Sequence, residues 1–158
     1  MGKKHLFTFA PLLAVAAVVV GYQGGGRAPR PRGEDKNVAA VRGVIEAQAA
    51  AWNRGDVAGY MEGYAKEDST TFVSGDTLTR GWQTVLDRYK ARYDTREKMG
   101  TLAFSELEFK PLSEFYIMAT GRWQLTREAD TPHGRFTLIF RRTVAGWRIV
   151  HDHTSSAS

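Results

Sequence analysis

The stretch Ala51-Trp52-Asn53-Arg54-Gly55-Asp56 decides the fold, because it predicts the end of one helix and the start of the next. Glycine adopts the left-handed conformation in which many helices end, and aspartate caps the first turn of a following helix. Upstream, residues able to face a core recur at steps of three and four: Val38, Val41, Val44, Ile45, Gln48, Ala49 and Trp52. Downstream, the same helical spacing recurs: Val57, Tyr60, Met61 and Tyr64.

A third helix is predicted further along the chain. It follows a short β-prone segment, residues 70–73, and a Ser-Gly-Asp turn at residues 74–76. Its core-facing side chains are spaced as on one side of a helix: Trp82, Val85, Leu86 and Tyr89. The first half of the domain is therefore expected to be mainly helical.

The second half of the chain is predicted to form strands. Aromatic and β-branched residues dominate four segments separated by turn-forming residues: residues 101–109, 115–127, 135–143 and 147–154. In the first segment the apolar alternation slips between Phe104 and Leu107, which predicts a β-bulge and a bend. We therefore expect an α+β, cone-shaped fold, with three N-terminal helices packed on a strongly bent antiparallel sheet and a pocket at its open mouth.

The first 33 residues are predicted to form an export signal and a linker. Lys3 and Lys4 precede fifteen uncharged, mostly apolar residues, a length typical of a signal-peptide core and short for a membrane-spanning helix. Residues 1–21 are assigned to a signal peptide or, alternatively, to a short uncleaved membrane anchor. Residues 22–33, rich in Gly, Pro and Arg, are expected to be a flexible linker before the domain at 34–158. The expected location is periplasmic or extracellular.

The basic charge of the chain lies outside the predicted domain. The 158 residues carry 22 basic and 17 acidic side chains, a net charge of +5 and a pI near 9.6. The whole surplus precedes residue 34: Lys3, Lys4, Arg27, Arg30 and Arg32. The domain is neutral, so we expect no nucleic-acid partner and no membrane contact beyond the N-terminal segment. The absence of cysteine excludes disulfides and thiolate sites.

An ordered set of short motifs covers residues 34–155. After the residues 51–56 quoted above come four further motifs: Tyr64-Ala-Lys-Glu-Asp68, Gly81-Trp82, Gly121-Arg-Trp123 and Gly134-Arg-Phe-Thr137. The set ends at Gly146-Trp-Arg-Ile-Val-His-Asp-His-Thr-Ser155. In this order the motifs resemble nuclear-transport-factor-2-like and ketosteroid-isomerase-like domains, and most of all exported bacterial SnoaL-like members. The resemblance implies a cone-shaped fold, a homodimer formed through the sheet, and a pocket between helices and sheet.

The resemblance does not settle the function. The family includes isomerases, cyclases, dehydratases and non-catalytic binding modules. Ketosteroid isomerases place a general-base aspartate after the second helix, near residues 71–73 here, and a second, neutral aspartate near Leu138. No carboxylate stands at either place in this sequence. Proton abstraction by that particular arrangement is therefore not expected.

His151 and His153 are the most distinctive candidates for chemistry. Because side chains alternate along a strand, a spacing of two places both imidazoles on the same face. The same alternation predicts that Trp147 and Ile149 share this face and that Asp152 points to the opposite one. An imidazole can act as a general acid or base.

Two other interpretations of the histidine pair stay open. The histidines form hydrogen bonds without doing chemistry, or they bind a metal ion whose third ligand comes from His133, Asp68 or Asp76. Asp68 is also a tentative catalytic carboxylate, with turn capping as the alternative. We expect no metal and no other cofactor.

Six aromatic side chains are predicted to line the pocket, with plain core packing as the alternative: Trp52, Tyr60, Tyr64, Trp82, Tyr89 and Trp123.

The first functional hypothesis is an exported, homodimeric domain that binds a small apolar or aromatic molecule without turnover. The second is an enzyme of the isomerase, dehydratase or cyclase kind, with His151 or His153 as general acid/base. The third is a protein-interaction module that uses the face of the sheet.

Overall fold

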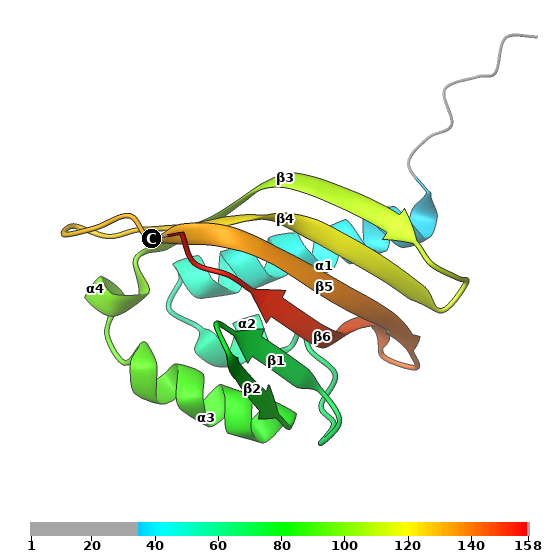
Figure 1. Cartoon of the computed structure of the whole chain (residues 1–158), viewed down its shortest axis with the longest axis horizontal. Coiled ribbons are helices and arrows are strands. Elements are labelled where there is room, and N and C mark those ends of the chain that lie inside the picture. The colour runs from blue at the N-terminus through cyan, green and yellow to red at the C-terminus, as the bar shows by residue number, and fades with distance from the viewer. Residues whose placement is uncertain (1–34, 158) are drawn as a thin grey trace, which may run out of the picture. The chain divides into compact units, whose positions relative to one another are not determined.

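Residues 35–157 are the part of the chain that the computed structural model describes, and they form the helices and strands of Figure 1. The helices are α1 (Lys36–Asn53), α2 (Val57–Met61), α3 (Trp82–Arg92) and α4 (Arg96–Met99). The strands are β1 (Thr71–Ser74), β2 (Thr77–Arg80), β3 (Thr101–Pro111), β4 (Tyr116–Thr126), β5 (His133–Thr143) and β6 (Gly146–Thr154). The predicted signal peptide and linker lie outside the described residues. Within those residues, no helix has the length and apolar character needed to span a membrane.

The turn between α1 and α2 forms as the sequence predicts. Gly55 has a positive φ of 86°, and the carboxylate of Asp56 accepts a hydrogen bond of 2.7 Å from the backbone N–H of Gly59. The side chain of Asn53 accepts a 2.7 Å hydrogen bond from the N–H of Leu102 and donates one of 2.9 Å to its carbonyl. The end of α1 is thereby fastened to the first residues of β3.

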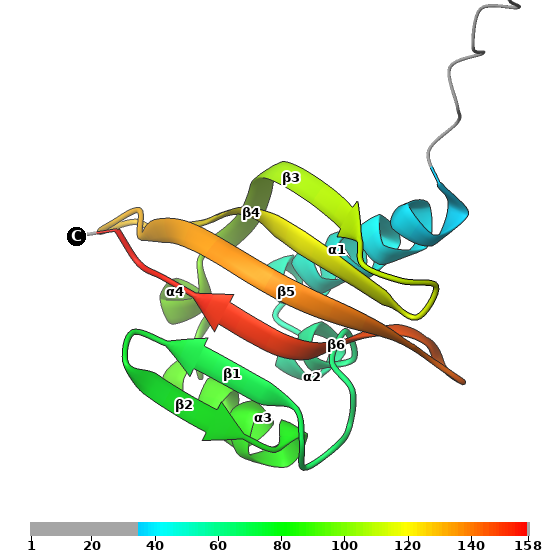
Figure 2. The same ribbon diagram turned by 45° about the vertical axis from the view of Figure 1, so that its right-hand side comes forward.

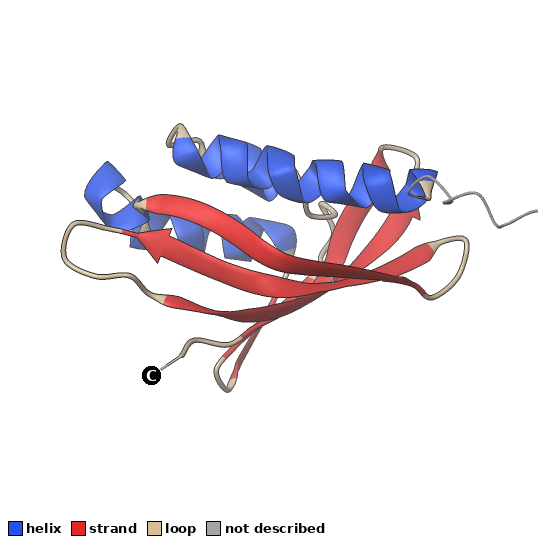
Figure 3. Cartoon of the chain, turned by 90° about the horizontal axis from the view of Figure 1, so that it is seen from above, coloured by secondary structure: helices blue, strands red, loops and turns tan. Residues whose placement is uncertain are grey.

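The six strands form one sheet in the order β2-β1-β6-β5-β4-β3. Neighbouring strands are antiparallel except β1 and β6, which pair in parallel. Figure 3 shows the sheet strongly curved, with the helices gathered on one side of it, and Figure 2 shows β1 and β2 beside β6. The predicted α+β cone fold is confirmed, with two additions: the short helix α4, and strand β2, which returns along β1 after a turn at Gly75 (φ 59°).

Two β-bulges bend the sheet. The predicted bulge in β3 is confirmed, because the pairing with β4 shifts between Ser105 and Glu108, and Glu106 has a φ of 50°. The second bulge lies in β6, where Ile149 pairs with Phe140 and His151 pairs with Ile139. The residue between them, Val150, has no partner on β5, so the side chains that follow it change faces.

The bulge in β6 corrects the face assignment made from the sequence. His151 and His153 share a face with each other, but they do not share the face of Trp147 and Ile149, which are buried. Asp152 takes that inward position instead, with 3% of its surface exposed. The correction has a simple physical cause: strict alternation fails where a strand carries one extra residue.

Candidate functional site

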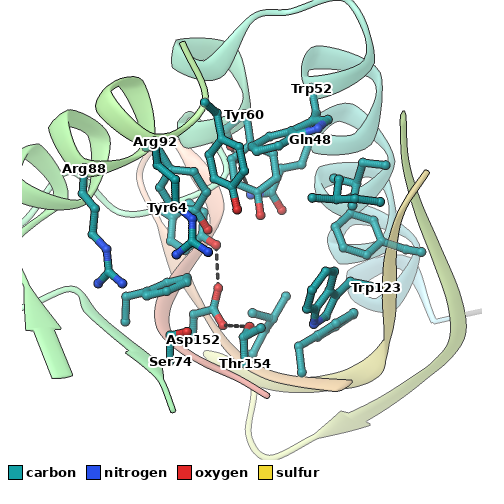
Figure 4. Close-up of a pocket in the computed structure, with 18 of the residues that line it drawn as sticks. Gln48, Trp52, Tyr60, Tyr64, Ser74, Arg88, Arg92, Trp123, Asp152 and Thr154 are labelled. Carbon is teal, nitrogen blue, oxygen red and sulfur yellow. Dashed lines mark hydrogen bonds between the residues drawn. The ribbon is translucent and has the colours of Figure 1, made fainter. Parts of the chain in front are cut away.

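A cavity of about 130 Å³ lies between the helices and the curved sheet (Figure 4). Helices α1, α2 and α3 supply one part of its lining, with Gln48 and Trp52 from α1. Strands β1 and β3 to β6 supply the other part, with Asp152 and Thr154 from β6. For scale, an engineered cavity of about 150 Å³ in another protein holds one benzene molecule. The space therefore suits a ligand of about one ring.

Aromatic rings form the helical wall of the cavity. Trp52 stands edge-to-face with Tyr60 and Tyr93, at centroid distances of 5.2 and 4.8 Å, and Tyr89 stacks on Tyr93 at 5.6 Å. Trp123 faces them from the sheet, and its indole N–H donates a 2.9 Å hydrogen bond to the carbonyl of Ser155. Such interlocked rings hold their positions and present flat apolar surfaces to a ligand.

Asp152 is the acidic side chain of the cavity. One carboxylate oxygen accepts a 2.6 Å hydrogen bond from the hydroxyl of Tyr64, and the other accepts one of 2.7 Å from the hydroxyl of Thr154 (Figure 4). Burial raises the pKa of Asp152 to about 6, although both hydrogen bonds and the charge of His153 act in the opposite direction. Within residues 35–157 no cation is ion-paired with this carboxyl, so it can gain or lose a proton near neutral pH.

Three buried tyrosines lie near this carboxyl, and the hydroxyl of Tyr64 is the one hydrogen-bonded to it. Tyr60, Tyr64 and Tyr89 line the cavity and interact with one another and with the charge of Asp152. Burial raises the pKa of all three phenols well above the usual value. They are therefore protonated at neutral pH and serve as hydrogen-bond donors beside a carboxylate that serves as an acceptor.

Two arginines from α3 also line the cavity. Arg88 is half-buried and donates a 3.0 Å hydrogen bond to the hydroxyl of Thr79. Arg92 is exposed, and its guanidinium lies 5.7 Å from the centre of the Tyr93 ring. Among the described residues neither arginine forms an ion pair with an acid, and both side chains extend from the same helix beside the cavity in Figure 4.

The structure places five of the six predicted aromatic residues on the cavity wall: Trp52, Tyr60, Tyr64, Tyr89 and Trp123. Trp82 lies elsewhere, where its indole N–H donates a 2.9 Å hydrogen bond to the carbonyl of Met61 and the ammonium of Lys66 sits 5.0 Å from its ring.

The three candidate catalytic residues from the sequence are not brought together. His151 lies beside Thr71, with 2.7 Å between the ring Nδ1 and the threonine hydroxyl. His153 is exposed and lines a separate groove together with Thr137. Asp68 is exposed and contributes nothing to the cavity lining. Across residues 35–157, no three histidine or acidic side chains gather as a metal ion would require.

Sequence reasoning missed Asp152, Arg88 and Arg92. A signal for the arginines was present, because Arg88 and Arg92 follow Val85 at the third and seventh positions, on the same helical stripe as the buried residues. Asp152 carried no such signal, since the bulge before it reverses the faces of the strand.

Comparisons with known proteins identify the family and the fold. The model of the SnoaL-like domain family matches residues 41–158. A nuclear-transport-factor-2-like protein of unknown function from Shewanella oneidensis is 37% identical, with a TM-score of 0.72 over 75% of this chain and 98% of its own. A ketosteroid isomerase-like protein from Erwinia carotovora atroseptica is 18% identical, with a TM-score of 0.63 over 78% of this chain and 98% of its own.

A third solved structure has the same fold. It is a nuclear transport factor 2-like protein from Salmonella enterica serovar Typhimurium, 18% identical, with a TM-score of 0.61 over 77% of this chain and 93% of its own. None of the curated proteins matches the chain. The likeness at 18% identity concerns the fold alone.

Proposed function

As the chain belongs to the SnoaL-like domain family, we propose that its cavity binds a small, largely apolar or aromatic molecule and that Asp152 exchanges a proton with that molecule. One observation carries the proposal: a carboxyl with a pKa of about 6 lies buried among aromatic rings, without an ion-paired cation among the described residues. Groups with pKa values near the working pH are the most effective general acids and bases.

The neighbouring hydroxyls support a proton-transfer reaction. Ionised Asp152 would accept a proton from an acidic C–H or O–H of the ligand, while Tyr60 and Tyr89 donate hydrogen bonds to the oxygen on which negative charge develops. Tyr64 and Thr154 hold the carboxylate in place. Return of the proton from Asp152 to another carbon of the ligand makes an isomerisation. Transfer of that proton to a departing hydroxide, which leaves as water while the C–O bond breaks, makes a dehydration. Attack of the carbanion, formed when a C–H loses its proton, on a carbonyl carbon elsewhere in the same ligand makes a cyclisation, and the resulting alkoxide takes the proton from Asp152.

This proposal replaces the histidines as the acid/base groups. His151 and His153 lie outside the cavity lining, whereas Asp152 lies in it. The hypothesis of binding without turnover was based on the absence of a carboxylate at residues 71–73 and at Leu138. Asp152 provides a carboxyl from a different strand, which favours catalysis.

The elimination of 5-nitrobenzisoxazole tests the proposed base without knowledge of the natural substrate. A base removes the proton on the ring carbon, the N–O bond breaks, and the coloured 2-cyano-4-nitrophenolate forms. We expect kcat/KM to rise with pH through about 6 and then to level, because only ionised Asp152 accepts the proton. Asp152→Asn should lower kcat/KM by about 100-fold or more, and His151→Gln and His153→Gln should change it little.

Four results would count against this assignment. A rate unaffected by Asp152→Asn, or independent of pH between 5 and 8, would exclude Asp152 as the base. Binding of small aromatic molecules without any elimination would leave a binding site without acid/base chemistry. Failure of all such molecules to bind would favour the protein-interaction alternative.

We also propose that the protein is exported. The support comes from Lys3, Lys4 and the apolar run of residues 6–20, with cleavage after Gly21. N-terminal sequencing of the protein from the periplasm or medium of producing cells should begin at Tyr22. Recovery of the intact N-terminus in the membrane fraction would instead favour the uncleaved anchor.

The remaining proposal concerns assembly. The resemblance to SnoaL-like domains supports a homodimer formed through the sheet. Sedimentation of the purified protein at micromolar concentration should give twice the mass of one chain, and a single-chain mass would contradict the proposal.

A further inference from the structure

Two guanidinium groups stand at the cavity without acid partners among the described residues. Arg88 and Arg92 are one helical turn apart on α3, so their side chains are neighbours on one face of that helix. The polar contact of Arg88 is with the neutral hydroxyl of Thr79, and the contact of Arg92 is with the ring of Tyr93. Neither guanidinium is therefore paired with a carboxylate among residues 35–157.

Five other arginines of the domain are paired with nearby acids. Ion pairs are formed at five places: Arg54 with Asp56, Arg122 with Glu106, Arg127 with Asp130, Arg135 with Glu106, and Arg141 with Glu67. The acid next to Arg88 on the helix, Asp87, accepts a hydrogen bond from Gln83 instead. Among residues 35–157, Arg80, Arg96, Arg142 and Arg148 also form no ion pair, but they lie outside the cavity lining, whereas Arg88 and Arg92 belong to it.

Like charges one turn apart on a helix repel each other. An anion placed between them removes that repulsion and receives charge-assisted hydrogen bonds from both guanidinium groups. Guanidinium groups match carboxylates especially well, because their planar N–H donors can bind both oxygens at once. The pair is consequently arranged for a carboxylate supplied from outside the chain.

We propose that Arg88 and Arg92 bind the carboxylate of a single-ring aromatic or unsaturated acid whose ring enters the cavity that Asp152 also lines. This inference rests on the proposed function and names the substrate class of the same cavity. In this proposal the two arginines determine the selectivity of the cavity for acids over neutral molecules.

The charges of the cavity fix the orientation of such an acid. Asp152 is mostly ionised at pH 7, so it repels the ligand's carboxylate from its own end of the cavity. A volume of about 130 Å³ leaves room for one ring in the cavity.

Binding of acid and amide pairs tests the inference. The probes are phenylacetate and 4-hydroxyphenylacetate with their amides, phenylacetamide and 4-hydroxyphenylacetamide, titrated against the purified protein by calorimetry. We expect each acid to bind about 10- to 100-fold more tightly than its amide. Arg88→Met/Arg92→Met should remove this preference, and the affinity for the amides should stay within about threefold.

A matched control separates local from overall charge. Arg80→Met/Arg142→Met removes the same two charges from exposed positions outside the cavity lining. This variant should keep the preference for acids. Raising the salt concentration should weaken the binding of the acids and leave that of the amides unchanged.

The outcomes distinguish this inference from the function on which it rests. If acids and amides bind the wild-type protein equally, the cavity binds aromatic molecules and the arginine subsite is wrong. If the Arg88→Met/Arg92→Met variant loses both ligands equally, the arginines act by supporting the structure, which also overturns the inference. If neither kind of probe binds, the proposed cavity function fails and the inference fails with it.

Discussion

Above about pH 6, Asp152→Asn should make the protein more stable than the wild type by about 1–3 kcal/mol. Burial raises the pKa of Asp152 in the folded protein to about 6, against about 3.9 in the unfolded chain. Ionisation is therefore easier after unfolding, and the wild type loses stability as the pH rises from about 4 to 6. Each pKa unit corresponds to about 1.4 kcal/mol, which limits the effect to about 3 kcal/mol.

Asparagine has nearly the same shape as aspartate and no charge to bury. Its carbonyl oxygen can accept one of the hydrogen bonds donated by Tyr64 and Thr154. The advantage of the variant should therefore be absent near pH 4, grow up to about pH 6, and remain constant above it.

Urea unfolding at pH values from 4 to 8 measures this difference. Asp94→Asn is the control, because the pKa of that exposed carboxyl is lowered by its hydrogen bond with Lys98, and its removal should bring no gain at high pH. An advantage of Asp152→Asn that is equal at pH 4 and pH 8 would point to better packing and would refute the ionisation argument.

Phe140→Ala should cost about 3–5 kcal/mol of unfolding free energy. Phe140 is fully buried on β5 and pairs across the sheet with Ile149, which is also fully buried. Truncation to alanine removes most of the ring's buried surface and leaves a cavity that the surrounding strands cannot fill. Because small domains are stable by about 5–15 kcal/mol, much of the total would be lost.

The same substitution at Phe115 provides the comparison. Phe115 is 52% exposed, so Phe115→Ala should change the unfolding free energy by about 0.5 kcal/mol or less. Urea unfolding of both variants gives the two values directly. Similar losses for the two phenylalanines would contradict the position of Phe140 in the core.

The helices and most strands could be predicted because their apolar residues are periodic. Residues 51–56 marked the turn between α1 and α2, and the slip between Phe104 and Leu107 marked the bulge in β3, since apolar residues stand on both sides of it. Strand β2 was missed because Thr77–Arg80 is short and has a single apolar residue, Leu78; its pairing with β1 stabilises it in the fold.

The acidic part of the site could not be predicted in the same way. After Val150 the strand continues as His-Asp-His-Thr, without an apolar residue that would reveal the change of face. The spacing of Arg88 and Arg92 from Val85 was a signal for the arginines, but charged residues on a helix normally extend into water, so this spacing alone did not assign them to the site. The aromatic wall could be predicted from the sequence, because aromatic side chains at helical spacing are buried whether they line a core or a cavity.

The extra residue in β6 also affects how functional residues should be transferred between relatives. A relative whose last strand lacks the bulge aligns with this chain only if Val150 is opposite a gap. Without that gap, the cavity-facing position of the relative is matched to His151, and the true counterpart, Asp152, is matched to a position on the outer face. Structural superposition, rather than residue counting, should therefore decide which carboxyl or imidazole is compared at this strand.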